Sequence, residues 1–195
     1  MPFAVRLLTP ADQSAAWTLG SVAFGYHDQP MPESWAADRP GRRTWGAFDE
    51  TGRLVAKALD REHSHWFGGR VVPAAGVAGV VVAPEWRGSG LVRLVLTRLL
   101  AEARERGAVI STLFDTIPFP YRAVGYEEVG AMTWRTIPTL ALAGIRPAPG
   151  ITLRPAEVAD VPALWELYRS AARASNGLME RAAPVFSYTP EQYLA

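Results

Sequence analysis

The segment with the clearest chemistry joins a run of valines to a helix-like run. Val80, Val81 and Val82 precede a short loop with the sequence Arg87-Gly88-Ser89-Gly90, and Leu91-Val92-Arg93 follow it. The first N–H groups of a helix lack partners within the helix and lie at the positive end of its dipole. Glycine lets a phosphate approach the backbone closely, and the arginines add positive charge. We therefore expect a pyrophosphate site here; the alternative is a plain strand-to-helix turn in which the glycines serve only the turn.

The elements around this loop predict a βαβ unit. The near-continuous β-branched run from Gly76 to Ala83 is typical of a strand buried on both faces. Apolar residues repeat at helical spacing over residues 91–106, and residues 108–114 form another buried-type run. The glycines therefore fall in the short loop between strand and helix.

The remaining elements complete an α/β chain. Thr9-Pro10 predicts a helix start, and Gly68-Gly69 predicts a turn. The expected elements are strands over residues 5–8, 44–48, 54–59, 71–74 and 132–137, and helices over residues 14–24 and near Trp35.

Composition excludes several classes of protein. The chain has 195 residues, 49% hydrophobic and 20% charged, which is typical of a globular protein. A net charge of +1 disfavours a nucleic-acid partner, and the absence of cysteine excludes disulfides and thiolate metal sites. The first residues lack a signal-peptide pattern, and the longest apolar run, residues 74–83, is too short to span a membrane. We expect a cytoplasmic protein without a membrane partner.

His63 and His65 alternate, so on a strand they share one face. A metal site would need a third ligand, for which Asp60 and Glu62 are nearby, and we expect instead a solvated hairpin edge and no metal. The other polar candidates are read as solvated loop residues: His27, Arg39, Arg42 and Arg43.

One short sequence pattern occurs twice in the chain, as an internal repeat. Leu8-Thr9-Pro10-Ala11-Asp12 is matched by Leu153-Arg154-Pro155-Ala156-Glu157, and each precedes a helix-like run. Residues 138–150, with three prolines and two glycines, read as a linker. We therefore expect one complete domain over residues 1–137 and the beginning of a second, similar domain over residues 151–195, apparently incomplete.

Several segments together resemble a known family. The loop Arg87-Gly88-Ser89-Gly90 resembles the pyrophosphate loop of GNAT N-acetyltransferases, although Val92 stands where that pattern has a small residue. Val82-Ala83-Pro84, Gly90-Leu91-Val92-Arg93 and the segment Tyr121-Arg122-Ala123-Val124-Gly125-Tyr126 are similar to the Eis-like (enhanced intracellular survival) subgroup. The resemblance covers about residues 4–137 and, more weakly, residues 150–195.

The resemblance implies a GNAT fold, a mixed central sheet flanked by helices, with acetyl-CoA as co-substrate and direct attack by a primary amine. In the family, the strand before the loop pairs with the pantetheine arm, which here means Val80 to Val82. The pyrophosphate sits on the loop amides, here residues 88–93, beside Arg87. Thr116 and Ile117 would also touch the cofactor, although their neighbours depart from the family's small-residue run. Tyr121 would be the acid that returns a proton to the CoA thiolate.

The resemblance also implies an acceptor site. Phe24, Tyr26 and Trp35 lie where the subgroup lines its amine-binding cleft, and the alternative is ordinary packing of a long loop. The implied acceptors are an aminoglycoside-like polyamine or a protein lysine, and a homo-oligomer is compatible with the resemblance. The subgroup's base is the carboxylate at the end of a third domain, so no residue here takes that role. Two alternatives stay open: a non-catalytic acyl-CoA-binding or assembly module, and a nucleotide-binding α/β protein.

Overall fold

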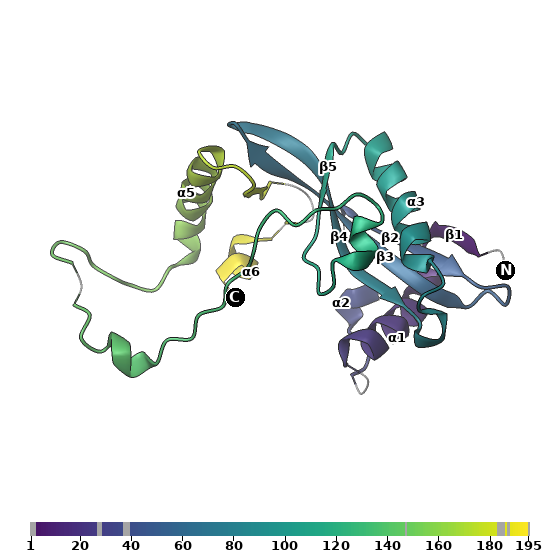
Figure 1. Cartoon of the computed structure of the whole chain (residues 1–195). Helices are drawn as coiled ribbons and strands as arrows, with labels where there is room; N and C mark the ends of the chain where they lie inside the picture. Colours follow the sequence, from purple (N-terminus) through teal and green to yellow (C-terminus); the bar gives the residue numbers. More distant parts are fainter. Residues whose placement is uncertain are drawn as a thin grey trace.

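A mixed sheet forms the body of the chain in the computed structural model, which describes residues 3–26, 29–36, 40–146, 148–182, 186 and 188–194. Strands β1 to β4 follow one another as antiparallel neighbours, and β5 is added parallel to β4 (Figure 1). This arrangement confirms the predicted mixed α/β sheet. The strands are β1 Ala4–Leu7, β2 Arg42–Phe48, β3 Leu54–Phe67, β4 Arg70–Val82, β5 Ile110–Thr112 and β6 Met179–Glu180.

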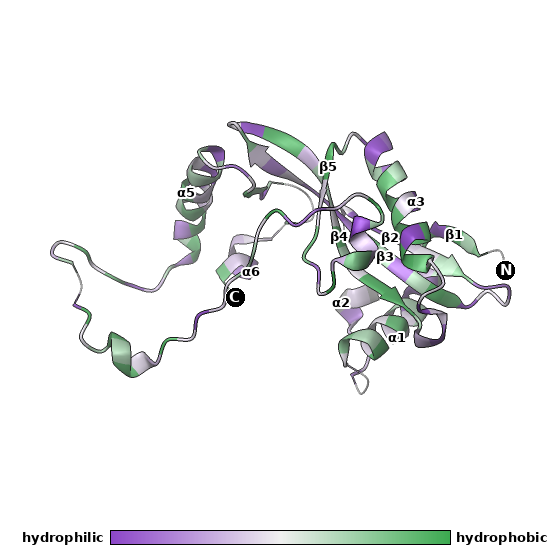
Figure 2. Cartoon of the chain, viewed as in Figure 1, coloured by the Kyte–Doolittle hydropathy of each residue, from purple (hydrophilic) through white to green (hydrophobic). Residues whose placement is uncertain are grey.

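Helices cover the two faces of this sheet (Figure 1). Helix α3 packs on β2, β3 and β4 through five buried residues, which confirms the predicted periodicity. Hydrophilic and hydrophobic residues alternate along its ribbon (Figure 2). The α-helices are α1 Gln13–Phe24, α2 Glu33–Ala36, α3 Leu91–Glu105, α4 Phe119–Arg122, α5 Val161–Arg173 and α6 Pro190–Leu194. Among the described residues, no helix is long and apolar enough to cross a membrane.

Two strand predictions need correction. The separate strands expected over residues 71–74 and 76–83 are one strand, because Gly76 continues the ladder with β3. β4 is fully buried only from Ala74 to Val77 and at Val81, so the expectation of burial on both faces holds for part of it. The strand predicted over residues 132–137 is wrong: that segment pairs with no described strand, and all six of its residues are exposed, so no packing against the sheet holds it in a ladder.

The internal repeat is present in the structure, but its two copies align at a different offset in sequence. Arg6 makes a two-bond ion pair with Asp12, and Arg154 makes the same pair with Asp160. In both copies the carboxylate also accepts a backbone N–H three residues before it, just ahead of a short 3₁₀ turn and a helix. The correct offset is therefore 148 residues rather than 145. His27 and Arg39 lie outside the described residues.

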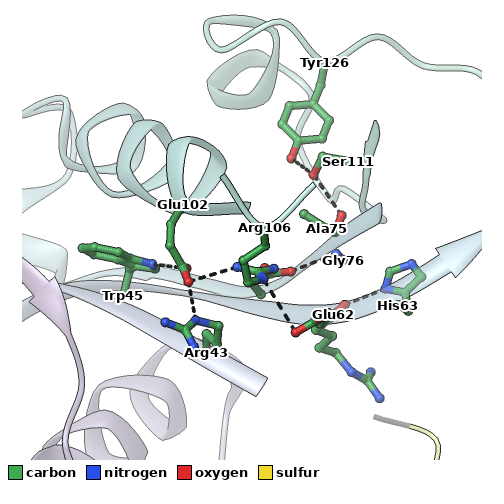
Figure 3. Close-up of polar contacts among 12 residues, drawn as sticks. Arg43, Trp45, Glu62, His63, Ala75, Gly76, Glu102, Arg106, Ser111 and Tyr126 are labelled. Atoms are coloured by element: carbon green, nitrogen blue, oxygen red, sulfur yellow. Dashed lines mark hydrogen bonds and ion pairs between the residues drawn. The ribbon is translucent and has the colours of Figure 1, made fainter. Parts of the chain in front are cut away.

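A buried carboxylate holds the middle of the sheet to the end of α3; Figure 3 shows its two partners, Gly76 and Arg106. Asp60, which is fully buried, accepts the Gly76 N–H at 3.1 Å and an Arg106 Nη2 at 2.5 Å. Arg106 also lies 3.1 Å from Glu102, which pairs in turn with Arg43. Burial raises the pKa of Asp60 even though Arg106 and the Gly76 N–H lower it. The carboxylate accepts from donors of both the sheet and the end of α3, so its removal would leave buried donors without a partner.

The prediction that the two histidines lie at a solvated edge is wrong. His63 and His65 share a face as expected, but both are buried, because the segment around β6 covers this part of β3. Their Nε2 atoms are 2.9 Å apart, and each Nδ1 lies within 2.8 Å of a carbonyl oxygen, of Arg61 and Gly177 respectively. No three His, Cys, Asp or Glu side chains gather as a metal-binding group in the described part of the chain.

We expect Asp60→Ala to lower the free energy of unfolding by about 2–4 kcal/mol. The change leaves the Gly76 N–H without an acceptor and removes a carboxylate from Arg106. Urea unfolding measures the loss. Glu128→Ala is the control, because its pair with Arg122 is exposed on both sides, and it should change stability by less than about 0.5 kcal/mol. Equal losses in the two variants would contradict this role for Asp60.

We also expect the chain to lose stability as the pH falls from about 7 towards 5. Burial lowers the pKa of His63 below its usual 6.5, so the unfolded chain takes up a proton here that the folded chain resists. The contribution of neutral His63 is complete above pH 6.5 and is lost progressively below it. His63→Asn should flatten this fall in urea titrations at a series of pH values. A variant whose stability falls as steeply as that of the wild type would refute the assignment.

Candidate functional site

The candidate site begins where β4 and β5 part. Their parallel ladder runs from Ala74 to Gly76 on β4 and stops at Thr112 on β5. Beyond it, no described strand pairs with the β5 side of residues 77–82. This edge includes the predicted Val80, Val81 and Val82, so their side of the strand is open to an extended ligand that adds to the sheet.

β4 is also irregular at this edge. The register with β3 shifts between Lys57 and Leu59, which leaves Gly79 and Val80 opposite a single residue. Gly79 has φ +55°, a conformation that glycine adopts without strain. The bulge redirects the backbone at the point where the open edge begins.

The predicted loop follows directly. Gly88 and Gly90 both have φ +80°, and a Cβ at either would meet no described atom within 4 Å. The backbone conformation therefore favours glycine at both positions, and no described atom fills the space that a Cβ would take there. Ser89 closes the turn instead, since its hydroxyl and its N–H both donate to the Trp86 carbonyl.

Helix α3 starts from this loop without a side-chain cap. The N–H groups of Leu91, Val92 and Arg93 have no acceptor among the described residues. The Leu91 side chain belongs to the core, so only its backbone can serve a ligand. Arg87 and Arg93 are exposed and make no ion pair with another described residue. Free donors and free positive charge therefore meet at one helix end, which suits an anion.

Tyr121 lies on the short helix α4, which packs against α3. Its ring contacts the core and the Tyr126 ring, whose centroid is 6.1 Å away. Burial and the nearby Asp115 raise the pKa of Tyr121, so its hydroxyl stays protonated through neutral pH. Tyr126, expected in the core, is half-buried and packs against the core, and it shares a 2.5 Å hydrogen bond with Ser111 on β5, which ties this segment to the sheet (Figure 3).

Thr116 and Ile117 lie on the loop between β5 and α4, and both are exposed. No hydrogen bond joins them to the glycine loop. The structure places them after β5, as predicted.

The aromatic residues predicted for the acceptor site form one group with a fourth that the sequence did not single out. Trp17 packs edge-on against Trp35 at 5.0 Å and stacks with Tyr26 at 6.3 Å. Phe24 in turn stacks with Tyr26, and half of the Phe24 surface is exposed. The place of Trp17 beside Trp35 could not be predicted from the sequence, because it depends on how α1 and α2 pack together.

A cavity of about 410 Å³ lies between α1, α2 and the sheet. Trp35, Lys57 and Gly79 all line it, so it reaches from the aromatic group to the bulge of β4. The sequence did not predict Lys57 in this lining either, because a lysine on a strand is expected to face solvent. Another cavity, of about 520 Å³, is lined by residues of the C-terminal part, Trp165 and Tyr193 among them.

Known proteins share this architecture. A GCN5-related N-acetyltransferase from Kribbella flavida matches 97% of this chain and 50% of its own, with a TM-score of 0.74 and 26% identity. An acetyltransferase of Trypanosoma brucei matches 70% of this chain with a TM-score of 0.58 at 22% identity, which shows the fold alone.

Similarity in sequence leads to the same group. An uncharacterized N-acetyltransferase of Streptomyces griseus is 32% identical over 93% of this chain and 46% of its own length. Another from Streptomyces avermitilis is 38% identical over 68% of this chain. The chain thus spans about half the length, or less, of the curated relatives it matches.

The family model described as "Acetyltransferase (GNAT) domain" matches residues 4–129, which include the whole sheet from β1 to β5, the glycine loop and Tyr121. The parted strands, the uncapped helix and this match agree, and the chain belongs to the GNAT acetyltransferase family.

Proposed function

We propose that this protein is an Eis-like N-acetyltransferase that moves the acetyl group of acetyl-CoA to a primary amine. One observation carries the proposal: the open edge of β4 leads directly into the uncapped start of α3, where Arg87 and Arg93 are unpaired. An extended pantetheine arm suits the strand edge of Val80 to Val82, and a pyrophosphate suits the helix end. Acetyl-CoA would supply the activated thioester.

The chain's own residues then have distinct roles. The backbone of residues 80–82 would align the arm, and the free N–H groups of residues 88 and 90–93 would hold the negative charge. Tyr121 would give its proton to the departing thiolate, and its raised pKa keeps that proton available. Thr116 and Ile117 stay candidates for a further cofactor contact, although their exposure lends it little support.

The acceptor is proposed as a polyamine of the aminoglycoside kind or a protein lysine. Support comes from the aromatic group around Phe24 and Tyr26, whose faces can attract ammonium groups. Trp35 extends this wall into the cavity of about 410 Å³. A homo-oligomer and a cytoplasmic location are kept as predictions from the sequence.

The domain organisation is likewise a proposal. The ion pair Arg154–Asp160 repeats Arg6–Asp12 in the same local setting before a helix, which supports a second, similar domain over residues 151–195. Residues 138–150 would be the linker; apart from one short 3₁₀ turn they form no helix or strand where they are described.

A non-catalytic acyl-CoA-binding module is the second candidate. The observation in its favour is that the cavity lining includes no carboxylate and no histidine among the described residues, and so offers neither of the usual bases to the amine. Release of free thiol in the presence of amines would exclude it.

We expect Tyr121→Phe to lower kcat about 100-fold, because an acid of this kind contributes roughly that factor or more. The binding of acetyl-CoA, measured by calorimetry, should be unchanged. Thiol release with a panel of amines gives the rate. Tyr126→Phe is the matched control, which loses a hydrogen bond to Ser111 but should keep kcat within a few-fold. Comparable rate losses in both variants would argue against Tyr121 as the acid.

We expect Arg93→Ala to weaken acetyl-CoA binding roughly tenfold, since a hydrogen bond to a charged group contributes about 1.5–3 kcal/mol. Arg98→Ala is the control, because Arg98 is exposed on the same helix but beyond its first turn. It should leave the Kd within about twofold in calorimetry at fixed salt. Equal weakening by both changes would mean that the helix attracts CoA only through general positive charge.

A further inference from the structure

Lys57 is the only lysine of the chain, and its amine is buried. Lysine normally buries its stem and keeps the charged head in water. Here the side chain is only 5% exposed, on the face of β3 that α1 covers. Its Nζ donates to the Ala16 carbonyl at 2.5 Å and lies 5.1 Å from the centre of the Trp35 ring. No described carboxylate pairs with it.

Helix α1 packs directly against this amine. Gly20 lies in the middle of the helix, and a Cβ there would come within 3.1 Å of the Lys57 Nζ. Glycine weakens a helix interior, so its presence here has a local reason: it makes the room that the amine occupies. The position of the amine is therefore specified from both sides, by the strand that carries it and by the helix above it.

An amine in this place gives up its proton more readily than an ordinary lysine does. Burial, and to a lesser degree the charge of Arg42, lower the pKa of Lys57 from 10.5 to about 8. An ordinary lysine is almost wholly protonated at neutral pH and cannot attack a carbonyl. Lys57 has a neutral fraction near neutral pH, and only the neutral form carries the free electron pair that attack requires.

The same cavity runs from this amine to the bulge of β4, which directly precedes the strand edge proposed for acetyl-CoA. Lys57 and Gly79 both line the space of about 410 Å³, and Lys57 lies directly across the ladder from Val81. Val81 is the middle residue of the open edge proposed for the pantetheine arm. The bulge at Gly79 and Val80 directly precedes Val81 on β4.

We propose that Lys57 is a site of self-acetylation: its buried amine, in the cavity beside the bulge of β4, takes the acetyl group from acetyl-CoA bound to the same chain. The inference rests on the proposed function. The Nζ electron pair attacks the thioester carbonyl, a C–N bond forms and the C–S bond breaks. The leaving thiolate takes up one proton, and the new amide nitrogen loses one to water. The products are Nε-acetyl-Lys57 and free CoA.

Peptide mass spectrometry of the full chain after incubation with isotope-labelled acetyl-CoA tests this. We expect one labelled acetyl group on the Lys57 peptide, at a rate that rises about tenfold per pH unit below pH 8 and levels off above it. In urea the exposed amine should react at least tenfold more slowly with acetyl-CoA. Lys57→Arg is the matched control, and it should bind acetyl-CoA but take up no label at residue 57.

Calorimetry on the same samples distinguishes a failure of self-acetylation from a failure of the proposed function. Acetyl-CoA binding without label on Lys57 would overturn self-acetylation and leave the proposed function standing. Labelling that is as fast in urea as in the folded chain would also overturn it, because the reaction would then owe nothing to the site. No acetyl-CoA binding at all would overturn both.

Discussion

The site depends on one constraint, the point at which β4 stops pairing with β5. Gly76 is the last β4 residue of the parallel ladder, and its N–H is held by the buried carboxylate of Asp60. Arg106 binds the same carboxylate from the end of α3, so one group fixes both the strand and the helix. A Cβ at Gly76 would lie 2.2 Å from the His63 ring, so this residue must be glycine. The open edge of residues 77–82 begins directly after this fixed point.

The elements near the loop were largely predictable because their signals are local. Val80 to Val82 form a strand because β-branched residues favour one, and α3 follows from an apolar stripe at helical spacing. Gly88 and Gly90 marked the loop because only glycine takes positive φ there without strain. These local rules located the cofactor half of the proposed site from sequence.

Features that depend on distant parts of the chain were not predictable in this way. Asp60 pairs with Arg106, which lies 46 residues further along the chain, and neither residue type predicts the other as its partner. His65 is buried because it reaches the Gly177 carbonyl, 112 residues away, so its neighbours in sequence suggested solvent instead. Lys57 was overlooked for the same reason: its environment is made by Gly20 of α1, on another element.

The central claim is that acetyl-CoA binds along the open edge of β4 and onto the start of α3. Hydrogen–deuterium exchange with and without acetyl-CoA tests it most directly, because the N–H groups of Leu91, Val92 and Arg93 and those on the open side of β4 have no acceptor among the described residues. The account predicts slower exchange in residues 77–82 and 88–93 on binding, with little change in α5. Protection confined to the C-terminal cavity around Trp165 and Tyr193, or none at saturating acetyl-CoA, would contradict it.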